Sequence, residues 1–151
     1  MKSKSFFLIA FLFIVTMMLY FWLHPSYEKS LEAKFYYETG NYRQAYTLAK
    51  EAFELDPYNK MAATVMTQSQ YSLRYANYIE DAKRYIKEIE TLVGNGEIDE
   101  ATRAKIRTIA DIMIKAYDKL APSVVVDEEL IKEAKEYHDK FATLLQKAHR
   151  H

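Results

Sequence analysis

Residues 6–23 are the feature that most constrains the fold, because the segment FFLIAFLFIVTMMLYFWL contains no charged residue. As a helix it would be about 27 Å long at about 1.5 Å per residue, which matches the hydrocarbon thickness of a bilayer. The Thr16 hydroxyl can bond back to the same helix, and Tyr20 and Trp22 fall at the far end, where amphipathic rings favour the headgroup layer. The segment therefore predicts a transmembrane helix that contacts the lipid bilayer.

Two other interpretations of this segment are weaker. A cleaved signal peptide would fit Lys2 and Lys4 ahead of an apolar stretch, but the stretch exceeds the usual length and residues 23–26 lack small side chains at paired cleavage positions. A buried core helix would need apolar surroundings on all sides, and no later part of the chain is apolar enough to supply them. We expect residues 1–24 to be a short tail followed by an uncleaved signal-anchor.

The sequence predicts insertion into a membrane more strongly than it predicts the side on which the C-terminal domain lies. Lys2 and Lys4 precede the segment, whereas Lys29, Lys34 and Arg43 follow it, so the positive-inside rule favours neither side. A very short basic tail normally stays in the cytoplasm while the following domain is exported. We therefore expect a single-pass protein of the bacterial inner membrane, with its C-terminal domain outside the cytoplasm.

Composition excludes several classes of protein. The 151-residue chain has no cysteine, which excludes disulfide frameworks, cysteine-ligated zinc, iron–sulfur clusters and thiol nucleophiles. Its 21 basic and 21 acidic side chains leave no net charge, so binding to nucleic acid is not expected. The length is that of one domain, and the 50% hydrophobic content is enough for a modest core.

The rest of the chain has apolar residues at helical spacing and no run of β-type alternation, which predicts an all-α fold. Helix ends are indicated at Gly40, at 56–57, at Gly94-Asn95-Gly96 and at 121–122. The helices predicted between these points cover residues 25–39, 42–55, 60–74, 76–93, 98–120 and 128–149. The third and fourth meet around Tyr75 and are either two helices or one.

Two of the predicted helices begin with capping signals. Asp127 can cap the last helix, with Val126 and Ile131 placed to form a hydrophobic staple. Asn41, followed three residues later by Gln44, is a variant of the capping box. Each helix also has one apolar stripe that must be buried against a neighbour, and the short connections imply antiparallel neighbours.

One helix pair has small, aromatic and turn-forming residues at regular positions: Ala33, Tyr36, Gly40, Tyr42, Ala45, Ala49, Ala52 and Pro57. Gly40 allows the first helix to end in a left-handed turn, and the alanines let helix backbones approach closely. This spacing resembles the tetratricopeptide repeat, whose 34-residue unit is two helices joined by a tight turn. The resemblance implies a TPR-like antiparallel helical hairpin array over residues 25–93.

The resemblance covers one complete unit, residues 26–59. In the next unit, Thr67, Arg74 and Ala76 stand where the family has a small residue, the turn glycine and a tyrosine. Residues 94–151 show no repeat, and we expect them to be a C-terminal helical pair that caps the open apolar face. A generic helical bundle is the alternative fold.

No pattern in the chain indicates an enzyme. The sequence lacks a glycine-rich phosphate loop, an H-E-x-x-H zinc motif and a nucleophile elbow. His138 has no carboxylate or second imidazole one helical turn away, so a structural role is expected for it rather than metal binding. We expect no catalytic residue, cofactor, metal or small-molecule substrate.

The tyrosines indicate a binding surface, since ten of the 13 lie between Tyr27 and Tyr85. A tyrosine combines a rigid apolar body with a polar tip, which suits peptide and helix recognition. The tetratricopeptide resemblance implies a concave groove lined by the inner helix of each unit, at Tyr27, Ser30, Lys34, Tyr37, Glu38, Met61, Thr64, Gln68 and Tyr71, with Tyr75 one turn further. The alternative is that half of these tyrosines fill gaps between helices.

Two classes of function follow from these features. The first is a membrane-anchored, TPR-like adaptor that binds another membrane or envelope protein and assists assembly or stability of a bacterial envelope complex, such as a motility or secretion machine. The second is a permanent structural subunit of a membrane complex with no separate adaptor role. These classes differ in whether the helical domain folds and binds by itself.

Overall fold

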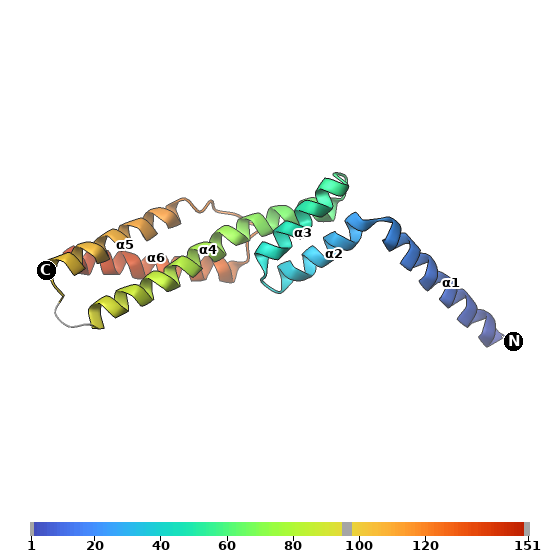
Figure 1. Ribbon diagram of the computed structural model, residues 1–151, viewed down its shortest axis with the longest axis horizontal. Coiled ribbons are helices and arrows are strands. Elements are labelled where there is room, and N and C mark those ends of the chain that lie inside the picture. The colour runs from blue at the N-terminus through green and yellow to red at the C-terminus, as the bar shows by residue number, and fades with distance from the viewer. Residues whose placement is uncertain (1, 95–97, 150–151) are drawn as a thin grey trace. The chain divides into compact units, whose positions relative to one another are not determined.

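The chain is helical through most of the residues that the structure describes, 2–94 and 98–149 (Figure 1). The computed structural model has these helices: α1 Lys2–Leu23, α2 Pro25–Glu38, α3 Tyr42–Leu55, α4 Lys60–Gly94, α5 Glu100–Asp118 and α6 Glu128–His149. The prediction of an all-α fold is confirmed, and α4 continues through Tyr75 as one helix. Asn95 and Gly96, two of the predicted stop residues, lie outside the described residues.

The chain divides into two compact units, Met1–Gln70 and Tyr71–His151. This differs from the single domain expected from the length, because the buried apolar residues form two separate clusters. The division falls inside α4, whereas the loop signals in the sequence place a boundary between residues 93 and 94. Each unit therefore has its own core.

Small side chains allow the helices of the first unit to pack closely. Ala33 of α2 and Ala49 of α3 have no exposed surface, and Leu48 and Val65 complete the same buried cluster. The chain turns between α2 and α3 at Gly40, whose φ of +81° is the left-handed conformation predicted for it. The two helices therefore form a tight hairpin, against which the first part of α4 packs.

A buried polar network joins α2 to the start of α4 in this unit. The side-chain amide of Asn59 donates to the Ser26 hydroxyl at 2.9 Å and to the Ser30 hydroxyl at 3.2 Å. The Ser26 hydroxyl in turn donates to the carbonyl of Ala52 at 2.8 Å. The side-chain oxygen Oδ1 of Asn59 accepts from the backbone N–H of Ala62 at 3.1 Å, so Asn59 also caps α4.

The predicted caps of α3 and α6 are present. Asn41 Oδ1 accepts from the backbone N–H of Gln44 at 3.3 Å. Asp127 Oδ1 accepts from the backbone N–H of Glu129 at 2.8 Å. Each bond satisfies one of the backbone donors that a helix leaves free at its N-terminus, so both starts are fixed by sequence-local chemistry.

The second unit is a three-helix arrangement of the later part of α4 with α5 and α6. Its core is aliphatic and aromatic: Tyr75, Tyr78, Ile79, Ala82, Ile89, Ile106, Ile109, Ala110, Met113, Val126, Ala134 and Phe141 are buried together. Val126 and Ile131, predicted as a hydrophobic staple, both belong to this cluster, Ile131 at its edge. The apolar stripes predicted on these helices are therefore the surfaces that meet.

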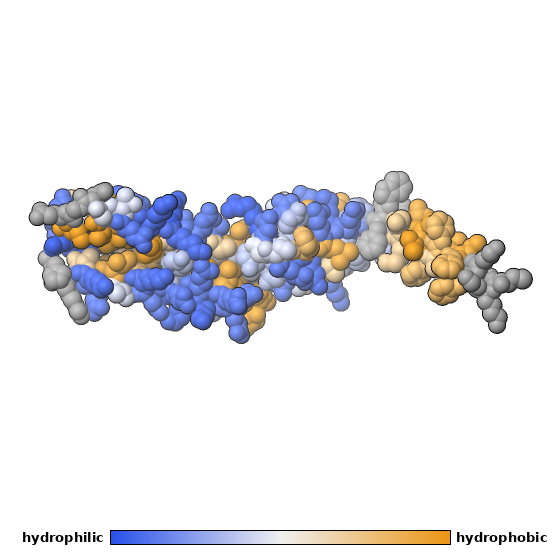
Figure 2. Space-filling view, turned by 90° about the horizontal axis from the view of Figure 1, so that it is seen from below, coloured by the Kyte–Doolittle hydropathy of each residue, from blue (hydrophilic) through white to orange (hydrophobic). Residues whose placement is uncertain are grey.

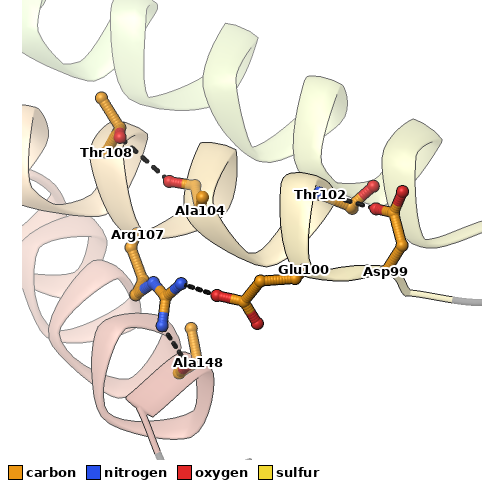
Figure 3. A network of polar contacts seen from close by, with 7 residues as sticks. All are labelled: Asp99, Glu100, Thr102, Ala104, Arg107, Thr108 and Ala148. Atoms are coloured by element: carbon orange, nitrogen blue, oxygen red, sulfur yellow. Dashed lines mark hydrogen bonds and ion pairs between the residues drawn. The ribbon is translucent and has the colours of Figure 1, made fainter.

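Polar contacts hold the N-terminal end of α5 (Figure 3). Asp99 Oδ1 accepts from the backbone N–H of Thr102 at 2.8 Å, and hydrogen bonds from Thr102 lower the pKa of this carboxyl. Arg107 forms an ion pair with Glu100 and donates to the carbonyl of Ala148 at 3.5 Å. The guanidinium therefore connects α5 to the last turn of α6.

Over residues 6–20 the side chains of α1 are apolar and exposed, apart from the hydroxyl of Thr16 and half-buried Ala10, and Figure 2 shows this apolar surface at the end of the chain that carries the helix. The Thr16 hydroxyl donates to the carbonyl of Leu12 at 2.8 Å, so the helix satisfies its own polar group. Among the described residues, no helix taken singly has the length and hydropathy of a membrane span. Phe6–Tyr20 and Pro25–Glu38 reach that level only as a pair bent by 91°.

Candidate partner-binding groove

A groove of about 500 Å³ lies between α2 and α4 within the first unit. Its lining is Lys34, Tyr37, Glu38, Lys60, Met61, Thr64, Val65 and Gln68. Six of the ten binding positions predicted from the sequence are among these residues, namely Lys34, Tyr37, Glu38, Met61, Thr64 and Gln68. Two helices that are separated in the chain by α3 therefore bring together most of the predicted surface.

Helical periodicity explains why these side chains share one groove. The α4 residues Met61, Thr64, Val65 and Gln68 follow a spacing of 3, 1 and 3, which places them on one face of a helix. On the opposite side of the groove, α2 contributes the ring of Tyr37 and two side chains of opposite charge, Lys34 and Glu38, which are one helical turn apart. The groove is therefore formed by two complementary faces rather than by a loop.

The groove has an apolar floor and a charged rim. Tyr37 and Met61 are half-buried and pack against the core of the first unit, beside buried Val65. On the rim, the Lys34 ammonium lies 3.7 Å from the Glu38 carboxylate, and both side chains are exposed. Such an arrangement can bury apolar side chains of a ligand while charges at the edge select its orientation.

Tyr37 is held by an aromatic neighbour from α3. Its ring centroid lies 5.6 Å from that of Tyr42, with the ring planes at 63° in an edge-to-face arrangement. This contact across the Gly40 turn fixes one side of the ring, while another part of Tyr37 lines the groove. Tyr37 therefore both packs between helices and lines the groove, whereas the sequence offered these two roles as alternatives.

Tyr27 does not line this groove. Its ring lies 6.5 Å from the ring of Tyr20 and 6.2 Å from that of His24, on the side of α2 that faces α1. It also borders a separate pocket with Leu55 and Asp56. Tyr27 lies seven residues, about two helical turns, before Lys34 and has nearly the same helical phase. It is outside the groove because it lies at the end of α2 next to α1, whereas the groove lies beside the other end of the helix.

The predictions for Ser30 and Tyr75 as groove residues are wrong. Ser30 has no exposed surface, because its hydroxyl accepts from Asn59 inside the first unit. Tyr75 is only 5% exposed and donates from its hydroxyl to the carbonyl of Ala121 at 3.2 Å. Both side chains have a polar atom that is satisfied internally, which spacing in the sequence does not reveal.

Tyr71 belongs to the second unit, not to the groove. It is half-buried against the apolar cluster of that unit, and the Arg74 guanidinium carbon lies 5.6 Å from its ring centroid. Because α4 continues past the end of the first unit, residues one or two turns beyond Gln68 pack in a different core. Tyr71 is therefore expected to contribute to stability.

A second groove, which sequence reasoning missed, lies between α4 and α6 in the second unit. It has a volume of about 650 Å³, and its aliphatic lining is Ile86, Ile89 and Leu144. Glu90, Glu136, Asp139, Lys140 and Thr143 form the rest of the lining. Ile86, Ile89 and Leu144 have helical apolar spacing, so the sequence contained a signal for an apolar surface, but not for how much of it a neighbour covers.

The titratable groups of the second unit form structural contacts. His138 Nδ1 lies 3.0 Å from Asp139 Oδ1, and the imidazole ring centroid lies 4.5 Å from that of Tyr117. Hydrogen bonds from Lys135 and His138 lower the pKa of Asp139. Over the described residues, no three His, Asp or Glu side chains are grouped closely enough to hold a metal ion.

The chain matches no known protein family, no curated protein and no solved structure. The resemblance to the tetratricopeptide repeat therefore depends on residues of this chain alone, chiefly Gly40 and the alanines on either side of it.

Proposed function

We propose that the protein is a membrane-anchored, TPR-like adaptor that binds another membrane or envelope protein in the groove between α2 and α4. The observation that carries the proposal is that six residues predicted as a binding surface line this one groove. Binding would assist the assembly or stability of a larger bacterial envelope complex. No catalytic step is part of the proposal.

The groove suits a helix or an extended peptide from a partner protein. A volume of about 500 Å³ accommodates a few side chains rather than a folded domain. Tyr37 and Met61 offer apolar contacts, since aromatic rings are common binding hot spots and methionine adapts to irregular shapes. Lys34, Lys60 and Glu38 place both signs of charge at the rim, which favours a partner with mixed charge.

Residues 6–23 would supply the membrane anchor in this proposal. The segment has no charged residue, and the large apolar side chains of α1 that the structure describes are exposed. An anchor confines the groove to the membrane surface, which raises the effective concentration of a partner in the same membrane. Modest affinity in the groove would therefore be sufficient.

A pair of threonines on α4 provides a matched test. Thr64 lines the groove, whereas Thr67 is exposed on the same helix outside the lining, with its hydroxyl donating to Ala63. Full-length protein extracted in mild detergent would be used to capture partners, which are then identified by mass spectrometry. We expect Thr64→Arg to lose a partner that Thr67→Arg and wild type retain. Equal recovery by both variants would remove the groove from the proposal.

The permanent-subunit alternative is favoured by one observation in the second unit. Ile86, Ile89 and Leu144 line an open groove, and Ile112 is 50% exposed on another helix of the same unit. An obligate subunit would cover such surfaces with a fixed partner. Under that alternative the protein is degraded when its complex is absent, whereas an adaptor remains stable without its partner.

A further inference from the structure

One face of α2 carries three large apolar side chains that the described chain leaves partly exposed. Tyr27, Leu31 and Phe35 are spaced four residues apart and are 38%, 45% and 62% exposed. The other side of the helix buries Ser26, Ser30 and Ala33 against the first unit. We call Tyr27, Leu31 and Phe35 the α2 stripe. A helix with one face in a core and another apolar face in solvent needs an explanation for the second face.

Contacts of Tyr27 show which way the α2 stripe faces. The Tyr27 ring centroid lies 6.5 Å from that of Tyr20 on α1 and 6.2 Å from that of His24 between the helices. The α2 stripe is therefore on the side of α2 that turns toward α1. Phe6–Tyr20 and Pro25–Glu38 are bent by 91°, so α2 extends almost perpendicular to α1.

We propose that α2 lies in the plane of the membrane surface, with the α2 stripe inserted at the boundary between lipid headgroups and acyl chains. The proposal rests on the membrane anchor assigned to α1 in the proposed function. If α1 follows the bilayer normal, a helix perpendicular to it lies parallel to the surface, and the side that turns toward α1 faces lipid. Interfacial helices bind in this way through one apolar face.

The charges on α2 indicate a zwitterionic lipid surface as the matching partner. Lys29 pairs with Glu51 at 2.7 Å and Lys34 pairs with Glu38 at 3.7 Å, so both cations of the helix are already neutralised. Glu28 and Glu32 are exposed. An anionic surface attracts helices with excess lysine and arginine, and α2 has none to offer. Apolar insertion beside an anchored span therefore accounts for the contact without electrostatic attraction.

The single tryptophan of the chain, Trp22, makes a direct test possible. Full-length protein would be reconstituted in phosphatidylcholine vesicles that carry bromine atoms near the headgroups, which quench tryptophan fluorescence on contact. Wild type reports on the anchor through Trp22. In a Trp22→Phe background, Phe35→Trp and Leu31→Trp report on the α2 stripe, and Thr47→Trp on the exposed surface of α3 is the matched control.

We expect strong loss of fluorescence for Phe35→Trp and Leu31→Trp in brominated vesicles, and little loss for Thr47→Trp. Quenched Trp22 with both stripe reporters unquenched would overturn the surface contact and leave the anchor in place. Unquenched Trp22 would overturn the anchor itself. Circular dichroism of each variant establishes that the helices are retained, and agreement between the two stripe reporters excludes an effect of one substitution on folding.

Discussion

The side-chain amide of Asn59 donates a hydrogen bond to the Ser30 hydroxyl at 3.2 Å, which fixes the start of α4 against the middle of α2. The same side chain caps α4 through the backbone N–H of Ala62 at 3.1 Å. Asn59 is 1% exposed, so water does not compete for these bonds. The groove between α2 and α4 therefore depends on a residue that does not line it.

Asn59→Ala is expected to destabilise the protein by about 3 kcal/mol. The substitution removes the cap of α4 and the hydrogen bonds that the buried hydroxyls of Ser26 and Ser30 accept from the Asn59 amide. The control is Asn41→Ala, which removes one exposed cap bond of α3 and should cost about 1 kcal/mol. Thermal unfolding of the full-length protein in detergent, followed by circular dichroism, measures both. Similar losses for the two variants would mean that the buried network contributes little beyond capping.

Gly40→Ala is expected to cost about 1 kcal/mol, since an alanine there must adopt the left-handed φ of +81°. No atom lies within 4 Å of the added Cβ, so the cost comes from the backbone alone. Gly94→Ala also has open space for its Cβ and no such φ, and it should leave stability unchanged or improved. Denaturant unfolding should therefore show a loss of stability for Gly40→Ala and no loss for Gly94→Ala, and equal losses would contradict the account of the turn.

The hydroxyls of Tyr75 and Tyr78 provide a matched pair in the second core. Tyr75→Phe removes a bond to Ala121 and should destabilise by about 1 kcal/mol. The Tyr78 hydroxyl is buried and has no hydrogen-bond partner among the described residues, so Tyr78→Phe should be neutral or stabilising. Urea unfolding at neutral pH compares the two. A larger loss for Tyr78→Phe would indicate a bound water or a polar partner at that hydroxyl.

Stability should also fall in alkaline solution because of Tyr78. Burial raises its pKa to about 12, with smaller effects from Tyr117, Asp118 and Asp139. Since the folded-state pKa lies above the unfolded value of about 10, the stabilisation is complete below about pH 10 and is lost as the pH rises toward about 12. Unfolding free energies measured through this window should decline more for wild type than for Tyr78→Phe. Parallel declines would assign the alkaline transition to other groups.

Local chemistry made much of the fold predictable. The turn at Gly40, the caps at Asn41 and Asp127 and the span of the last helix follow from residues that act within one or two helical turns. Six of the predicted groove residues, Tyr37 and Thr64 among them, also line one pocket between α2 and α4, whereas partner binding there stays a prediction. These features need no knowledge of distant contacts.

Features that depend on long-range pairing were missed. Asn59 precedes α4, where an N-cap could be expected, but nothing in the spacing shows that its amide reaches Ser26 and Ser30 in another helix. Tyr75 has the same helical phase as a groove residue, and only the position of Ala121 shows that its hydroxyl is held inside the second core. The division within α4 likewise has no local signal.

The helix α4 continues for 35 residues, and the boundary between the two compact units lies within it. A protease finds no loop at residues 70–71, and a cut there would leave about four carbonyls of one fragment and about four N–H groups of the other without helical partners. In proteins whose compact units are joined by a flexible linker, one unit can be replaced without cutting a helix of the other. Here both cores contain part of α4. Neither core can therefore be transferred to another protein unless α4 is cut or is transferred whole.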